Sequence, residues 1–237
     1  MTQTAPKTFG YLLYPGFALL DVCGPLEIFT ALSSVVPIEM FLIALDSLEP
    51  VSSRVSAESI PGFVGSPMEK VIPMPTLEQR IVPTHTLDTV PDLDVLIIPG
   101  GFGGGAAAQN PKVLEFIKNT KARNIITVCN GAPILAATGL LDGHRATTNK
   151  WFYEYITQLR PQVNWVPKAR WVHDGRYWTS SGVTAGMDVA AAYIREVFGE
   201  KVGELCTDIM EYSPELNSDN DPFCDIEKKY VPPQDQQ

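Results

Sequence analysis

The chain has 237 residues, a formal net charge of −9 and 45% hydrophobic residues, which is ordinary for a globular protein. This length allows one large domain or two small ones, and the composition argues against general disorder and fibrous classes. The acidic balance and the lack of a Lys/Arg cluster argue against a nucleic-acid partner, because phosphate binding needs a basic face. We therefore expect no nucleic-acid partner, and the chemistry of the candidate residues described below points to a small-molecule substrate instead.

The sequence shows no segment typical of a membrane or secreted protein. Apolar runs such as residues 95–98 and 134–137 are far shorter than the ~20 residues that cross a bilayer. Residues 1–7 are polar and lack the basic start and apolar stretch of a secretory signal. The four cysteines (23, 129, 206 and 224) form no CxxC pair and no metal-ligand spacing. We expect reduced thiols, no bound metal and a cytoplasmic location.

Short apolar runs alternate with stretches of helical periodicity, and Pro and Gly separate them. In the first part of the chain the pattern predicts a strand at 8–14, a helix at 19–32 that bends or restarts at 24–25, a strand at 38–45, and hairpins and loops over 46–90. In the middle it predicts a strand at 93–98, a helix at 111–121, a strand at 124–128 and a helix at 131–138. In the last part it predicts strands at 164–166 and 170–179, the second turning at 174–175, and helices at 187–198 and 201–212.

This alternation predicts an α/β fold, with a mostly parallel sheet covered by helices on both faces. We expect residues 1–212 to form a single domain. Residues 213–237 are acidic and contain prolines, and they are predicted to form a poorly packed or partner-wrapping tail. In such sheets the chemistry gathers at the carboxyl ends of the strands, so the turns that follow the strands are the places to search for a site.

The most informative turn follows the predicted strand at 124–128. Its β-branched residues run directly into Cys129, and a helix of small residues begins at once, as in a strand-to-helix nucleophile elbow with sulfur in place of oxygen. The helix N-terminus and its free N–H groups are expected to favour the thiolate and to stabilise an anion formed when it attacks. The alternative is an inert buried cysteine.

Two further turns carry candidate residues. The glycine-rich turn at 99–105 contains Gly100 and Gly101 and matches neither a P-loop nor a dinucleotide fingerprint. We interpret it as part of an anion hole in which the Gly101 and Asn130 N–H groups act together, the alternative being only a tight turn. Asp21 follows the first strand in an apolar run. It is either a helix N-cap or a carboxyl group with a raised pKa that faces the cleft and transfers protons.

Aromatic and small residues surround these turns in the sequence. Trp151 belongs to an aromatic group, with Phe152, Tyr153, Trp171, Tyr177 and Trp178, that either packs in the core or lines a small apolar pocket or dimer face. Thr184 lies in a small-residue turn, where it either hydrogen-bonds within the cleft or caps the following helix.

Four segments together resemble a known family. LLYPGFALLDVCGPLE, IIPGGFGGG, TVCNGAPILAATGLLDGHRATTN and GVTAGMDVA look like the ThiJ/PfpI family of the class I glutamine-amidotransferase-like superfamily, and most of all its isonitrile hydratase-like branch. The resemblance covers about residues 8–212. It implies a flavodoxin-like three-layer sandwich, a homodimer, a reactive cysteine at Cys129 and an acid, Asp21, that hydrogen-bonds the thiolate.

The sequence departs from the family pattern at two positions. Asn130 stands where isonitrile hydratases carry Thr, and Asn149 stands where many relatives carry His. The histidines of this chain lie at other positions, 85, 144 and 173. A Cys–His pair therefore cannot be assembled from matched positions, and neither peptidase nor glutaminase activity is expected. A mechanism in which an acid assists the cysteine remains.

The leading hypothesis is a cofactor-free, cysteine-dependent hydratase or lyase that converts an isonitrile to an N-substituted formamide. Cys129 attacks the electrophilic carbon, the Gly101 and Asn130 N–H groups hold developing charge, and Asp21 moves the proton. Two alternatives use the same thiol. One is the conversion of 2-oxoaldehydes to 2-hydroxy acids, as in glyoxalases, and the other is a redox-sensing protein whose Cys129 is oxidised.

Overall fold

The computed structural model describes residues 4–60, 75–226 and 229. Its main feature is a seven-stranded sheet in the order β10-β11-β7-β6-β1-β2-β5. β10 and β11 form an antiparallel hairpin, and all the other neighbours in this sheet are parallel. The sheet strands are β1 (Thr8–Leu12), β2 (Glu39–Ala44), β5 (His85–Thr86), β6 (Val95–Ile98), β7 (Asn124–Thr127), β10 (Trp171–Asp174) and β11 (Tyr177–Ser180).

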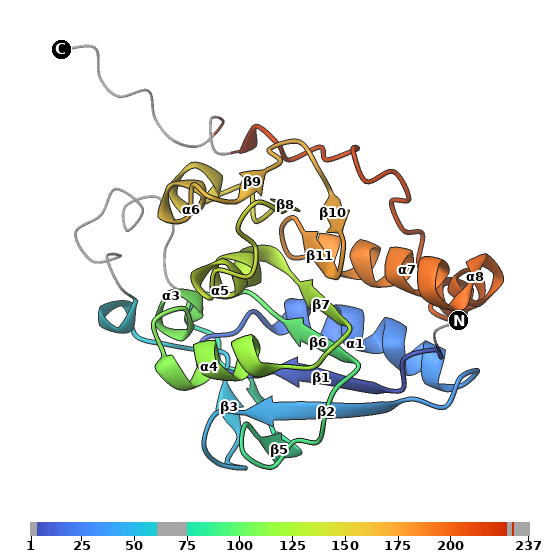
Figure 1. Cartoon of the computed structure of the whole chain (residues 1–237), viewed down its shortest axis with the longest axis horizontal. Helices are drawn as coiled ribbons and strands as arrows, with labels where there is room; N and C mark the ends of the chain where they lie inside the picture. Colours follow the sequence, from blue (N-terminus) through green and yellow to red (C-terminus); the bar gives the residue numbers. More distant parts are fainter. Residues whose placement is uncertain (1–3, 61–74, 227–228, 230–237) are drawn as a thin grey trace.

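Helices cover both faces of this sheet, so the predicted three-layer α/β sandwich is confirmed (Figure 1). On one face α1 (Leu19–Ser33), α7 (Ala185–Phe198) and α8 (Glu200–Ile209) pack against one another. On the other face α5 (Ala132–Ala137) contacts both α3 (Gly104–Ala107) and α4 (Pro111–Asn119). Among the described residues, no helix combines the length and the apolar character needed to cross a membrane.

The core is apolar because the central strands are buried on both sides. All four residues of β6 are buried, as expected for a parallel strand between two helical layers. An aromatic cluster joins β1 to the helices of one face, with the Phe9 and Phe29 ring centroids 5.1 Å apart. Tyr193 of α7 packs edge-on against both rings and against Trp178 of β11. Trp171, Tyr177 and Trp178 thus lie in the core, the first of the two alternatives for the aromatic group.

Several local predictions hold and others need correction. α4 begins as its sequence predicts, because the Asn110 side chain accepts a hydrogen bond from the Lys112 N–H (3.0 Å) and proline occupies the first turn. The expected restart of α1 at Gly24–Pro25 is wrong, because the helix runs unbroken from Leu19 to Ser33 with Pro25 inside it. Packing against α7 and α8 holds this helix together although proline removes one of its hydrogen bonds.

The region 46–90 contains short elements, as predicted. β3 (Val51–Ser52) pairs in antiparallel fashion with β4 (Arg80–Ile81), and η1 (Ala57–Ser59) lies between them in sequence. Residues 61–74 of this region lie outside the described residues. The sequence pattern missed β5, which lies in this region but pairs in parallel with β2 in the main sheet. Elsewhere it missed α3, α6 (Tyr153–Leu159), η2 (Cys129–Gly131) and β8 (Arg145–Ala146), which pairs with β9 (Asn164–Trp165).

The segment after α8 also requires a correction. Most of residues 213–226 are exposed, as expected of a poorly packed tail, but Asp221 in their midst is 2% exposed, so the expectation fails at this point. In Figure 1 this segment, in red, runs back over β10 toward β9. The physical reason is a set of buried polar contacts that hydrophobic periodicity does not reveal.

The topology brings three turns to one edge of the sheet. β1, β6 and β7 are parallel neighbours, so their carboxyl ends lie together. Asp21 follows β1, Gly100 and Gly101 follow β6, and Cys129 comes after β7. The predicted site residues from three separate parts of the chain therefore meet at the carboxyl edge.

Candidate functional site

Cys129 lies at a sharp turn between β7 and α5. Its backbone has φ +57°, a left-handed conformation that is unfavourable for a residue with a side chain. The turn is fixed on both sides, because the Cys129 N–H donates to the Ser181 carbonyl (3.0 Å) and the Cys129 carbonyl accepts from the Thr148 hydroxyl (3.0 Å). The turn predicted from the sequence is thus present, and an observed backbone strain of this kind is typical of functional sites.

The sulfur of Cys129 is surrounded by hydrogen-bond donors. The Asn149 side-chain amide donates to it at 3.1 Å. The backbone N–H groups of Asn130 and Val183 also donate to it. This ring of donors can stabilise negative charge on the sulfur, or on an atom bonded to it.

The resting ionisation of the thiol differs from the expectation. Burial raises the pKa of Cys129 well above its usual value, and the negative charge of Asp21 raises it further. The donors from Asn130, Asn149 and Val183 oppose this rise but do not outweigh it. The expected resting thiolate is therefore wrong. The physical reason is that only 6% of the residue is exposed, and the loss of hydration destabilises the thiolate more than the hydrogen bonds from the surrounding amides stabilise it.

Asp21 lies in the first turn of α1 and is completely buried. It is not the N-cap, which is Ala18. Its Oδ2 accepts a hydrogen bond from the Gly100 N–H at 2.8 Å, and its carboxyl group also interacts with the Cys129 thiol. Burial raises the pKa of Asp21 to about 7, against the opposing hydrogen bonds from Gly100 and Cys129. The carboxyl group therefore faces the cysteine, and it can both hold and release a proton near neutral pH.

The glycine-rich turn and Asn130 form a reciprocal pair instead of an open anion hole. The Gly101 N–H donates to Asn130 Oδ1 (2.6 Å), and Asn130 Nδ2 donates back to the Gly101 carbonyl (3.1 Å). The prediction that the Gly101 N–H is free to hold an anion is therefore wrong, since the Asn130 side chain already occupies it. A Cβ on Gly100 would lie 2.8 Å from Asp21 Oδ2, so this close packing requires glycine.

The two remaining predicted residues lie at the periphery. Trp151 is half-buried, and its backbone N–H donates to Asn149 Oδ1 (2.9 Å). Trp151 is therefore linked to the sulfur through that asparagine. Thr184 occupies the N-cap position of α7 without a capping hydrogen bond from its side chain. Its hydroxyl accepts from Arg170 Nη2 (2.9 Å) instead.

Sequence reasoning singled out Asn149 only as a departure from the family pattern and did not see it as a donor to the sulfur. The signal that could have identified it is its place in the family pattern, where many relatives carry His. The amide of Val183 left no signal, because any residue supplies a backbone N–H.

The histidines take no part in these contacts. His85 packs edge-on against Phe41, His144 lies within 3.3 Å of Asp174, and His173 stacks on the Trp178 ring. Within the described part of the chain, no group of three or more His, Cys, Asp or Glu side chains is arranged to hold a metal ion.

Two cavities, of about 360 and 310 Å³, are lined by none of the site residues.

Comparison with known proteins identifies the family. The profile of the DJ-1/PfpI family matches residues 45–196. An isonitrile hydratase from Pseudomonas putida is 33% identical over 208 residues, which cover 86% of this chain and 78% of that protein. The chain belongs to the DJ-1/PfpI family.

Solved structures of the DJ-1/PfpI family share the fold. A ThiJ/PfpI family protein from Pseudomonas syringae superposes with a TM-score of 0.70 at 29% identity, covering 95% of this chain and 81% of that one. DJ-1beta from Drosophila melanogaster gives a TM-score of 0.69 at 19% identity and covers 87% of this chain and 98% of its own. The family resemblance seen in the sequence motifs is thereby confirmed.

Proposed function

We propose that this DJ-1/PfpI protein is a cofactor-free hydratase that adds water to an isonitrile and releases an N-substituted formamide. The observation that carries the proposal is the pairing of Cys129 with a buried Asp21 carboxyl whose pKa is raised to about 7. Such a pair supplies a nucleophile and a group that can act as acid or base at neutral pH. The similarity to the isonitrile hydratase of Pseudomonas putida supports the choice of substrate.

The first half of the proposed reaction forms a covalent intermediate. Asp21 as carboxylate takes the proton of the Cys129 thiol, and the sulfur attacks the terminal carbon of the isonitrile. The protonated Asp21 then gives its proton to that same carbon, so that one C–S and one C–H bond form and a thioimidate results. The Asn149 amide and the Asn130 N–H stabilise the sulfur while it carries negative charge.

The second half releases the product. Asp21 takes a proton from a water molecule as that water attacks the thioimidate carbon, and Asp21 then gives this proton to the substrate nitrogen. As the C–S bond breaks, the new hydroxyl group becomes the formamide carbonyl, its proton passes through Asp21 to the sulfur, and the N-substituted formamide leaves. The net change is the addition of one water molecule, and Asp21 and Cys129 return to their starting state.

The redox-sensor alternative has less support. Cysteines that sense peroxide are accessible and have a low thiol pKa, because the thiolate is the form that is oxidised. Cys129 is almost fully buried and its pKa is raised.

The test is to incubate the protein with cyclohexyl isocyanide and, separately, with methylglyoxal, and to detect the formamide and lactate by mass spectrometry. We expect N-cyclohexylformamide from the unaltered protein and none from Cys129→Ala or Asp21→Asn. Cys206→Ala is the matched control, because Cys206 is also buried but lies in α8, and it should retain turnover. Lactate without formamide would replace the proposal with the glyoxalase alternative, and full activity in Asp21→Asn would refute the proton-transfer role.

A further inference from the structure

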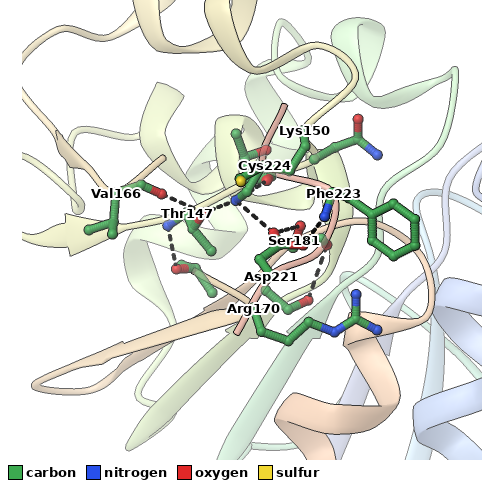
Figure 2. A network of polar contacts seen from close by, with 12 residues as sticks. Thr147, Lys150, Val166, Arg170, Ser181, Asp221, Phe223 and Cys224 are labelled. Atoms are coloured by element: carbon green, nitrogen blue, oxygen red, sulfur yellow. Dashed lines mark hydrogen bonds and ion pairs between the residues drawn. The ribbon is translucent and has the colours of Figure 1, made fainter. Parts of the chain in front are cut away.

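Residues 213–226, here called the C-terminal strap, are tied to the domain by a buried ion pair. Asp221 Oδ2 lies 3.5 Å from Lys150 Nζ, and both side chains are almost completely buried, with exposures of 0% and 2%. The Ser181 hydroxyl donates to Asp221 Oδ2 (2.8 Å), and the Phe223 N–H donates to its Oδ1 (3.0 Å). Figure 2 shows these groups converging between the strap and the domain. Asp221 thus occupies a built site and does not merely lie against the surface.

A second anchor lies a few residues earlier in the strap. The Arg170 N–H donates to the Ser218 carbonyl (2.6 Å), and Arg170 Nε pairs with Asp188 (2.7 Å). Asp188 also accepts a hydrogen bond from the Glu215 N–H (2.9 Å). The strap is therefore held at residues 215, 218 and 221, which fixes its course over β10.

The Lys150 side chain folds back onto residues 147 and 148 and holds the segment 147–150 in a closed turn. Its Nζ donates to the Thr147 hydroxyl and to the Thr148 carbonyl (3.2 Å), as Figure 2 shows for Thr147. Burial lowers the pKa of Lys150 to about 8, and the attraction of Asp221 opposes that change. Among the described residues, Asp221 is the only carboxylate within 4 Å of this buried ammonium group. Without it the ammonium would be buried unpaired, and the segment would have to open or lose the charge.

The segment that Lys150 closes is the one that holds the cysteine. Thr148 donates to the Cys129 carbonyl, and Asn149 donates to the Cys129 sulfur. Ser181, the other partner of Asp221 outside the strap, accepts a hydrogen bond from the Cys129 N–H through its carbonyl. Lys150 and Ser181, the two partners of Asp221 in the rest of the domain, are therefore each adjacent to, or identical with, a residue that contacts Cys129.

We propose that Asp221 is a positioning residue for Cys129. By neutralising Lys150 it keeps residues 147–150 closed, and this places the Asn149 amide on the sulfur. The strap thus belongs to the site although none of its residues touches the thiol. This inference concerns the state of the thiol and does not depend on which substrate the protein converts.

The test compares Asp221→Asn with Asp219→Asn. Asp219 is exposed in the same strap, so its variant makes the same change of charge without touching Lys150. The folded protein is treated with iodoacetamide over a range of pH, and the alkylated fraction of the peptide that contains Cys129 is measured by mass spectrometry after digestion. The pH dependence of the alkylation rate gives the apparent pKa of the thiol. We expect Asp221→Asn to raise that pKa and to lower the thiolate fraction about threefold to tenfold, the effect of one lost hydrogen bond. Asp219→Asn should leave the profile unchanged.

A second comparison asks whether the effect passes through Asn149. In an Asn149→Ala background, where the donor is already absent, Asp221→Asn should produce no further change in the profile. Ser181→Ala removes one hydrogen bond to Asp221 without leaving a charge unpaired, so it provides a milder variant should Asp221→Asn fail to fold, with a smaller shift in the same direction. An unchanged or lowered apparent pKa, or an undiminished shift in the Asn149→Ala background, would overturn the proposal.

Discussion

The buried carboxyl of Asp21 predicts an unusual dependence of stability on pH, which Asp21→Asn should remove. The pKa of Asp21 is raised from 3.8 to about 7, chiefly by burial. The folded protein therefore keeps a proton that the unfolded chain releases near pH 4. Because the folded state binds more protons in this range, the free energy of unfolding falls as pH rises from about 4 to about 7, and the contribution is constant above that. A difference of about 3 between the two pKa values corresponds to about 4 kcal/mol in all.

The asparagine variant is uncharged throughout and can still accept the Gly100 N–H through its Oδ1. Urea denaturation of both proteins at about pH 5.5 and about pH 8 measures the difference. Between these values the unaltered protein should lose about 2 kcal/mol relative to Asp21→Asn. Contributions from other groups, such as Lys150, are common to both proteins and cancel. Parallel stability profiles would show that Asp21 titrates like an exposed carboxyl group, and it could not then supply a proton near neutral pH.

Three further substitutions test the packing around the site. Gly100→Ala places a Cβ 2.7 Å from the Asn130 backbone nitrogen, and it should lower the free energy of unfolding by about 1–3 kcal/mol in urea titrations. Asn130→Ala removes both side-chain hydrogen bonds to Gly101, so we expect a loss of about 1–3 kcal/mol together with reduced turnover, and unaltered turnover would argue against a role for this turn. Asp188→Ala leaves Arg170 buried and unpaired, and a thermal melt should show destabilisation of about 3–5 kcal/mol, whereas a change below 1 kcal/mol would contradict the buried pairing.

The sequence predicted those parts of the molecule that local pattern determines. The apolar runs that became β1, β6 and β7 and the turn at Cys129 are visible because buried strands and tight turns restrict residue type over a few positions. The rule that parallel strands gather their carboxyl ends at one edge then placed Asp21 and Cys129 together.

The details of the site depend on contacts between distant residues, and the sequence could not predict them. The Asn130 side chain occupies the Gly101 N–H across 29 positions of sequence, and Ser181 reaches Asp221 across 40. The thiol pKa also escaped prediction, because it reflects how completely the finished fold excludes water from Cys129. Hydrophobic periodicity likewise gave no sign that the strap is anchored to the domain, because the contacts that anchor it are polar.

The left-handed backbone at position 129 is a conformation in which glycine would be more comfortable than any residue with a Cβ. If a homologue no longer used the thiol, replacing Cys129 by glycine would remove roughly 1–2 kcal/mol of local strain. Keeping cysteine at this position therefore carries that cost in backbone strain. Glycine at the corresponding position would then mark descendants that have abandoned cysteine chemistry while keeping the fold.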